Sequence, residues 1–450
     1  MLIAPVMDYK SGFAPARKPL ANGTSRLMAS LRQSIAPVAA LLLSVAILLM
    51  GSGLQGTLLP VRANLDAFTD IDIGILGSFY YVGFTAGCLA GPYLISRVGH
   101  IRTYLALVSV ASAVALVHAM VVTPSIWWVL RAVTGFCFSV LYIIIESWLN
   151  ERADNSNRGT IFSVYTIINL TVITVGQLML NLADPRAFPL FAMISILISL
   201  ASVPVAMTRA QSPEPVPLVQ LDLRSLMRLS PVGFIGCFAH GLSSGAFWSL
   251  GPVFAIQGRL DTLSVSLFMS ATVLGGAFGQ YPLGRLSDRI DRRIVIVAIC
   301  LSAAAAGLGM TFLNDRSLWQ LCAYGFCFGI FAFPLYAVSV AHANDLAKPS
   351  AFVETSSGLM LVFGIGCALG PVMAATIEAL TTVKALFLFT AAVHVLLALF
   401  TLRRITYRAP VAPEEKVDFN DALVAARTVA PIELHDMSET GVEEEMKQGR

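Results

Sequence analysis

Charged residues are scarce in this 450-residue sequence. Asp, Glu, Lys and Arg together make up 13% of the chain, whereas apolar residues make up 56% and the mean hydropathy is +0.75. About a quarter of a typical soluble domain is charged, so a soluble chain of this length would lack the polar surface needed to cover itself. The composition therefore argues against a soluble protein and predicts a chain that crosses a membrane many times.

Motifs for several kinds of chemistry are also missing. The seven cysteines all lie within apolar runs and show no CxxC or Cys/His spacing, so we expect neither disulfides nor a metal site. The net charge of +3 is not gathered in a basic cluster, which argues against nucleic-acid binding. Metalloprotease, serine-hydrolase, paired-Asp and phosphate-loop motifs are absent. We therefore expect no enzyme activity, no cofactor and no ATP-driven pump.

Long apolar runs dominate the chain instead. Twelve runs of about 20 residues, the length that spans a bilayer core, begin near positions 34, 73, 102, 126, 159, 187, 231, 262, 294, 317, 351 and 382. The first run exceeds the core of about 7–15 residues found in signal peptides, so we expect it to remain as a membrane helix. The sequence thus predicts an all-α integral membrane protein with twelve transmembrane helices.

The positions of Lys and Arg predict the orientation. With a cytoplasmic N-terminus, Arg131 lies in the membrane, and the outer loops contain only five of the 30 Lys and Arg residues: Arg62, Arg186, Arg259, Arg316 and Lys384. Cytoplasmic loops are enriched in these residues. We therefore expect both termini to be cytoplasmic and the protein to lie in the plasma (inner) membrane.

A polar stretch divides the chain into two halves. Residues 208–230 contain Pro213, Pro215 and Pro217 with several charges, and we interpret them as a cytoplasmic linker. The expected organisation is therefore a cytoplasmic N-terminal tail (1–33), a six-helix bundle (34–207), the linker (208–230), a second six-helix bundle (231–405) and a cytoplasmic C-terminal tail (406–450).

The two halves carry signs of an internal repeat. The sequence "GFCF" occurs at 135–138 and again at 325–328, an offset of 190 residues. Aligning Arg97 of "SRVGHIR" with Arg289 of "DRIDRR" gives an offset of 192. Two unrelated landmarks thus agree, which predicts pseudo-symmetric bundles with a solute site at their interface near mid-membrane.

The loop "GRLSDRIDRR" at 284–293 carries the most informative motif. Together with the twelve runs and the central linker, it resembles the major facilitator superfamily of secondary transporters, whose loop pattern is Gly, three residues, Asp-Arg, one residue, Gly and then basic residues. The matching residues of the second half are Gly284, Asp288, Arg289, Arg292 and Arg293. Those of the first half are Arg97, Gly99 and Arg102. In the second half, Asp291 replaces the second Gly of the pattern. In the first half, Pro92 replaces the first Gly and Ser96 replaces the Asp. The resemblance covers residues 34–405, and "ESWLNERADNSNRGTIFSVY" resembles the YcaD-like subgroup.

This resemblance implies a conformational latch. Asp288 would face the start of the fifth helix, near Arg158 and Gly159, while the cytoplasmic side is closed. A carboxylate at a helix N-terminus gains about 0.3–1 kcal/mol when exposed and up to about 2 kcal/mol when partly buried. Because Ser96 carries no charge, we expect a one-sided latch, with Glu354 meeting Arg97 or Arg102. The alternative is that these charges only solvate a turn and fix the topology.

One face of the fourth helix is polar. Steps of four, four, three and four residues connect Arg131, Gly135, Ser139, Tyr142 and Glu146. An Arg in a membrane helix costs on the order of 2.5–3.5 kcal/mol and therefore needs a cavity or a partner, and "RAVTG" at 131–135 also matches a pattern of the family. We expect this face to line a central cavity that handles substrate or protons. The alternative is that Arg131 and Glu146 extend to the two membrane surfaces.

Two further helices carry polar stripes. The fifth has Tyr165, Asn169 and Gln177, and the seventh has His240, Ser244 and Trp248, both at helical spacing. Either His240 or Glu354 is a candidate proton carrier, and a hydrogen-bonded packing role is the alternative for the histidine.

These observations predict a function. We expect a secondary active transporter that moves a small organic solute by alternating access, with proton coupling and efflux as the favoured mode. A non-transporting membrane sensor or scaffold on the same fold is the alternative. The expected partners are the solute, protons and the lipid bilayer, and we expect a monomer.

Overall fold

The structure is a computed structural model that describes residues 38–153, 158–207, 219–257, 261–312, 317–348, 351–381, 385–407, 409–412, 415–417, 419 and 432–434. The helices of the first half are α2 (Ala39–Leu65), α3 (Asp70–Val98), α4 (His100–Met120), α5 (Pro124–Arg152), α6 (Arg158–Leu178), the 3-10 turn η2 (Met179–Leu182), α7 (Phe188–Leu200) and α8 (Ser202–Ala206). The short elements between the halves are β1 (Val219–Leu221) and α9 (Leu223–Leu229). The second half contains α10 (Pro231–Ile256), α11 (Thr262–Arg289), α12 (Arg292–Phe312), α13 (Leu318–Ala332), α14 (Leu335–Asn344), α15 (Phe352–Thr381) and α16 (Leu386–Ile405), followed by β2 (Ile432–Leu434).

Eleven of the described helical segments are long and apolar enough to cross a membrane. The twelfth segment of this length is α10, whose 26 residues span about 39 Å at 1.5 Å per residue. Its many glycines and serines, together with His240, lower its mean hydropathy. The all-α, twelve-helix prediction is therefore confirmed, with α10 as the twelfth helix.

Three predicted helices are interrupted. The tenth run forms α13 and α14, which are separated at Phe333 and Pro334 because proline lacks an amide hydrogen and clashes with the preceding turn. The sixth run ends as α7 and α8, and the fifth ends in η2. The predicted start of the first run, position 34, lies outside the described residues.

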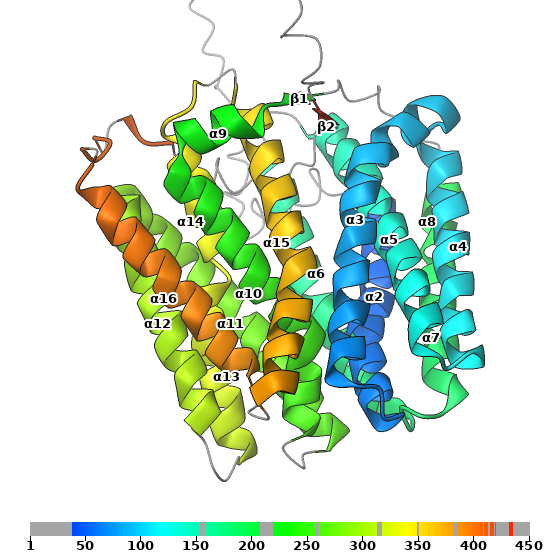
Figure 1. The fold of residues 1–450 in the computed structure, drawn as a ribbon. Helices are drawn as coiled ribbons and strands as arrows, with labels where there is room; N and C mark the ends of the chain where they lie inside the picture. The colour runs from blue at the N-terminus through cyan, green and yellow to red at the C-terminus, as the bar shows by residue number, and fades with distance from the viewer. Residues whose placement is uncertain are drawn as a thin grey trace, which may run out of the picture.

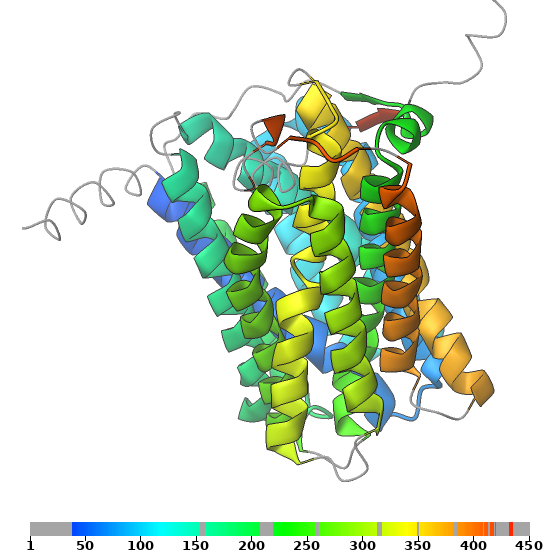
Figure 2. The same ribbon diagram turned by 90° about the vertical axis from the view of Figure 1, so that its left-hand side faces the viewer.

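The two halves repeat one packing plan. In the first half α3 packs on α5, α2 on α6 and α7, and α4 on α5 and α7. The same pairs recur in the second half as α11 on α13, α10 on α15 and α16, and α12 on α13 and α16. The molecule is therefore two pseudo-symmetric six-helix bundles that stand side by side (Figures 1 and 2).

The halves meet along α3 and α15 and where α2 and α6 approach α10 and α11. At the end opposite α9 the contact is tight: a Cβ on Gly74 would lie 2.5 Å from Ala375 Cβ, and one on Gly77 would lie 2.0 Å from Ser249 Oγ. There Asn181 Nδ2 also donates to Ser266 Oγ across the boundary at 3.1 Å. We call this the closed end and the other the α9 end.

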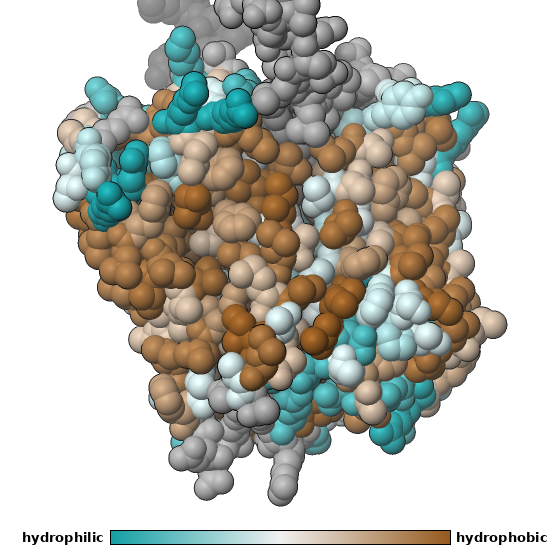
Figure 3. Space-filling view, in the orientation of Figure 1, coloured by the Kyte–Doolittle hydropathy of each residue, from teal (hydrophilic) through white to brown (hydrophobic). Residues whose placement is uncertain are grey.

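The surface and the ends agree with a membrane protein. Figure 3 shows a broad hydrophobic band on one face, with hydrophilic residues gathered toward the two ends. Large apolar side chains such as Phe278, Leu301 and Leu396 are exposed, as expected for a surface that contacts lipid.

The α9 end also joins the linker to the C-terminal segment. Strands β1 and β2 pair in parallel, with Val219 opposite Ile432 and Leu221 opposite Leu434. Residues 409–412, 415–417 and 419 lie at the same end (Figure 2). The sequence predicted a linker and a C-terminal tail at these positions, but not their contact.

Candidate functional site

Two neighbouring cavities lie between the halves. The smaller, of about 250 Å³, is lined by α2, α3, α5 and α6 of the first half and by α10 of the second. The larger, of about 560 Å³, is lined by α6 of the first half and by α10, α11, α14 and α15, with Phe419 also on its wall. Trp248 and Ile173 line both cavities, so these two side chains form the boundary between the two spaces.

Arg131 supplies the charge of the smaller cavity. Its guanidinium lies over the ring of Tyr80, 4.3 Å from the ring centroid, an arrangement in which the aromatic face attracts the cation. Its Nε is buried and has no hydrogen-bond partner among the described residues. The smaller cavity is therefore lined by a cation that has an unsatisfied donor.

Glycine brings Tyr80 to this position. A Cβ on Gly135 would lie 1.9 Å from the Tyr80 carbonyl oxygen, and one on Gly83 would lie 1.9 Å from the Ala132 carbonyl oxygen. Helices α3 and α5 thus approach closely, as membrane helices do at small residues. This contact holds the Tyr80 ring beside Arg131.

His240 lies in an aromatic setting on the larger cavity. Its ring stacks on Phe363 at a centroid distance of 5.4 Å and lies 6.1 Å from Tyr336, and all three residues line the cavity. The histidine Nδ1 is buried without a hydrogen-bond partner among the described residues. Its ring therefore has a nitrogen without a partner among the described residues, where a proton can bind.

Other predicted cavity residues separate into two groups. Tyr142, Gln177 and Trp248 line the smaller cavity, and Ser244 lines the larger. Ser139 instead lies where α5 meets α3, because a Cβ on Gly87 would come within 2.1 Å of its hydroxyl oxygen.

The remaining three predicted residues are more enclosed. Tyr165 is buried against Phe162, with ring centroids 6.3 Å apart. Asn169 has a buried side-chain oxygen without a hydrogen-bond partner among the described residues. Glu146 is buried, within electrostatic range of Tyr142 and Tyr336.

Some lining residues were not predicted. Gln55 and Ser249 line the smaller cavity, and Gln280 lines the larger. Gln55 is an amide near the middle of the first apolar run, and such an isolated polar residue in a membrane helix was the available signal.

The charged turn between α11 and α12 forms a network within the second half. Arg292 pairs with Asp288 at 3.1 Å and with Asp345, directly after α14, at 2.7 Å, and the side chains of Arg292 and Asp345 are each only 1% exposed. Arg293 pairs with Asp291 at 2.7 Å. Burial tends to raise the pKa of the Asp291 carboxyl, but hydrogen bonds from Arg293 outweigh it and lower that pKa below its ordinary value.

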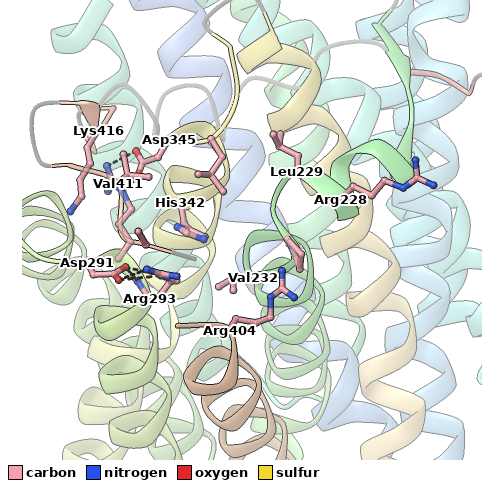
Figure 4. A pocket seen from close by; sticks show the side chains of 14 residues that line it. Arg228, Leu229, Val232, Asp291, Arg293, His342, Asp345, Arg404, Val411 and Lys416 are labelled. Carbon is pink, nitrogen blue, oxygen red and sulfur yellow. Dashed lines mark hydrogen bonds and ion pairs between the residues drawn. The ribbon is translucent and has the colours of Figure 1, made fainter. Parts of the chain in front are cut away.

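A small pocket of about 60 Å³ adjoins this network at the α9 end. Figure 4 shows Lys416, Asp345, Asp291 and Arg293 on one side of it and Arg404 and Arg228 on the other. His342 of α14 also lies on its wall. The pocket is formed by the second half, α9 and the C-terminal segment, so it is separate from the cavities between the halves.

Comparison with known proteins identifies the family. A model described as Major Facilitator Superfamily matches residues 233–434, and one described as Sugar (and other) transporter matches residues 26–214. Proteins named uncharacterized MFS-type transporter YcaD are 25% identical, from Escherichia fergusonii over 84% of this chain and 98% of theirs, and from Salmonella typhi over 82% and 96%. The chain belongs to the major facilitator superfamily. It is therefore a multi-pass membrane transporter.

Solved structures share the fold of this major facilitator protein. The nucleoside transporter NupG is 16% identical, with a TM-score of 0.68, over 82% of this chain and 99% of its own. A bacterial homolog of the human lysosomal transporter Spinster, in an inward-facing and occupied conformation, is 13% identical, with a TM-score of 0.66, over 85% and 98%. At these identities the likeness shows the common fold alone.

The structure places the family's loop residues as follows. Asp288 pairs with Arg292 of its own half, and the side chains of Arg158 and Gly159, its predicted neighbours, lie outside the described residues. Gly284 is buried beneath Phe419, whereas Arg289 is exposed.

In the first half of this transporter, Gly99 joins α3 to α4 with φ +91°, a conformation that favours glycine. Arg97 donates to the Tyr93 hydroxyl at 3.3 Å, and Arg102 is exposed. Among the described residues Glu354 forms no ion pair with either arginine in this conformation, and its side chain is exposed at the start of α15. The charged network of this conformation therefore belongs to the second half.

Proposed function

We propose that this protein is a proton-coupled secondary transporter that moves a small organic solute with an anionic group by alternating access, with efflux as its direction. The observation that carries the proposal is Arg131, a cation with a free donor in a cavity between the two halves. A charge in the membrane needs a partner, and a solute anion supplies one.

The lining favours an amphipathic solute. Tyr80, Tyr81 and Phe84 surround the charged cavity, and the larger cavity beside it has Phe333, Tyr336 and Phe363 on its walls. Aromatic surfaces bind the apolar groups of a ligand, and a small number of polar groups fix the orientation of that ligand. We infer a solute whose anionic end meets Arg131 and whose apolar body lies beyond Trp248.

Proton coupling is assigned to His240. Histidine changes charge near physiological pH, and this one lines the larger cavity with an available Nδ1. Glu146 is the second carrier that we propose, because it is a buried carboxyl group within electrostatic range of Tyr142 of the smaller cavity and Tyr336 of the larger.

The closing motion uses the charged turn. In the conformation in which the α9 end closes, we propose that Asp288 reaches the N-terminus of α6 and that Glu354 approaches Arg97 or Arg102. We also propose that the α9 end is cytoplasmic, because the Lys and Arg residues concentrate in the loops of this end.

Proteoliposomes with an imposed pH gradient test the function. We expect an amphipathic carboxylate or phosphate compound to move with the gradient, and Arg131→Met to abolish its transport. Arg131→Lys should retain part of the transport activity, because it keeps the charge but loses the planar arrangement of donors. Arg403→Gln, a change at an exposed residue of α16, is the matched control.

Two results would contradict the proposal. Transport that is unaffected by Arg131→Met would remove the cavity arginine from the solute site. Saturable binding of a solute that never crosses the bilayer would favour a membrane sensor on the same fold.

A further inference from the structure

The C-terminal segment is fixed to the end of α11. Lys416 Nζ donates to the carbonyl oxygens of Ser287, Asp288 and Ile290 at 3.2, 3.3 and 2.5 Å. The last carbonyls of a helix have no partner within it, and a cation at this end interacts favourably with the helix dipole. Lys416 thus caps α11 from a segment more than one hundred residues away in the chain.

A second attachment connects the segment to the buried ion pair. The Val417 amide donates to Asp345 Oδ1 at 3.0 Å, and the Val417 carbonyl accepts a hydrogen bond from Arg292. Arg292 and Asp345 are therefore joined to each other and to the backbone of the same tail residue. All these partners belong to α11, the α11–α12 turn, α12 and the end of α14, so the segment is attached to the second half.

Phe419 extends from this attachment to the larger cavity. Its side chain is 3% exposed and belongs to the main hydrophobic core, and it lines the cavity beside Gln280 and Tyr281. It fits because residue 284 is glycine: a Cβ there would lie 2.2 Å from Phe419 Cδ1. An aromatic ring of the tail thus covers the cavity near the last turns of α11.

We propose that residues 415–417 and 419 form an autoinhibitory lid, in which Phe419 closes the larger cavity at the α9 end while Lys416 and Val417 hold the lid on the second half. This inference does not depend on which solute is carried or on its coupling ion. In this proposal the bound lid blocks the α9 end of the cavity, and release of the lid opens that end. The lid occupies the same turn that carries Asp288, so it also competes with the latch between the halves.

Cysteine accessibility in the purified full chain tests the lid. The reporter is Thr166→Cys, at a position that lines the larger cavity from α6, in protein whose two cysteines that are not buried, Cys322 and Cys327, are replaced by serine. We expect Phe419→Ala and Lys416→Met each to raise the rate of labelling by a charged methanethiosulfonate at least about tenfold, as for the opening of a local segment. Glu415→Gln, at an exposed residue of the same segment, should leave the rate unchanged.

A second variant displaces the ring without altering the tail. Gly284→Ala should raise the labelling rate as Phe419→Ala does, because the new methyl group takes the space of the ring. In the double variant the two effects should not multiply, since each removes the same obstruction. Equal rates in the parent protein and all variants, or effects that multiply, would overturn the lid.

General loosening of the protein is measured separately. Ser112→Cys places a reporter between α4 and α7, where Ser112 Oγ contacts Ser195 Oγ at 2.8 Å. Its labelling should stay slow in every lid variant. If it accelerates together with Thr166→Cys, the variants have destabilised the bundle and the lid proposal is wrong.

Discussion

At the scale of single residues, the contact between Arg131 and Tyr80 depends on the absence of a side chain at Gly135. The helices α3 and α5 meet backbone to backbone at this glycine, so the position of the charged group in the cavity follows from helix packing. Elsewhere a glycine has free space: a Cβ on Gly56, on the wall of the same cavity, would meet nothing within 4 Å. The two glycines therefore provide a matched comparison.

Gly135→Ala should destabilise the protein by about 1–3 kcal/mol, the usual cost of adding volume to a tightly packed site. Gly56→Ala should change the stability little. The midpoint of thermal denaturation in detergent measures the stability of both variants. Equal midpoints would show that α3 and α5 separate without cost, contrary to the geometry.

Residue spacing predicted part of the site. Counting along the fourth helix found Arg131 and Tyr142, which line the cavity, but it placed Gly135 and Ser139 on the same face, whereas the structure puts them against α3. Small residues in a membrane helix serve close packing as readily as a polar surface, and the spacing alone does not separate the two. Gln55 was missed although Ser52, three residues earlier, lines the same cavity, because glycines and leucines surround this short polar pair in the sequence.

At the scale of elements, the buried pair of Arg292 and Asp345 connects the start of α12 to the end of α14. Both side chains are almost fully removed from solvent, so the loss of Asp345 leaves the buried charge of Arg292 with only Asp288, whose side chain is 29% exposed, as an acidic partner. Asp345→Asn should therefore lower the free energy of unfolding by about 3–5 kcal/mol. Arg292→Met combined with Asp345→Leu should recover much of that loss, because it removes both charges.

Denaturation midpoints of these variants measure the effect. Arg289→Gln, at an exposed arginine of the same turn, should change the stability by no more than about 0.5 kcal/mol. If Asp345→Asn costs no more than Arg289→Gln, the two helices are not held by the ion pair.

The neighbouring carboxylate predicts a dependence on pH. Hydrogen bonds from Arg293 lower the pKa of Asp291 despite its burial, so the charged form stabilises the fold at neutral pH. That contribution is complete above the ordinary Asp pKa of about 4 and is lost as the pH falls through the lowered pKa. The difference in melting midpoint between the parent protein and Asp291→Asn should therefore be present at neutral pH and shrink as the pH falls below the ordinary Asp pKa of about 4. A difference that is constant over this range would rule out the titration of Asp291.

The breaks within the interrupted helices could not be predicted from the sequence. Hydropathy located the tenth run, but the break between α13 and α14 depends on Pro334, and proline is tolerated within many membrane helices. The same chain contains Pro60, Pro92 and Pro252 inside continuous helices. Packing around each proline decides the outcome, and the sequence pattern does not contain that information.

At the scale of the whole molecule, the closed end must open if the transporter alternates. Asn181 and Ser266 meet there across the two halves. A short thiol cross-link between Asn181→Cys and Ser266→Cys should abolish transport of the solute found in the proteoliposome screen, and reduction should restore it. Each single variant should remain active, and full activity of the cross-linked protein would contradict opening at this end.

The fold was predictable at this scale because apolar runs of bilayer length leave few alternatives. Two sequence repeats with nearly the same offset predicted that the two halves are pseudo-symmetric. The same pairs of helices pack together in both halves, as this prediction requires. The packing of the C-terminal segment against the second bundle was not predictable. It depends on a few contacts of Lys416, Val417 and Phe419, and these residues form no periodic pattern in the sequence.

The pairing of β1 with β2 has a consequence for biosynthesis. β1 emerges from the ribosome before the second bundle, whereas its hydrogen-bonding partner is made only after α16 has entered the membrane. Until translation reaches residue 434, the segment after the first bundle therefore has an unpaired strand edge. A nascent chain that stalls before this point would expose that edge to other chains or to quality-control proteases.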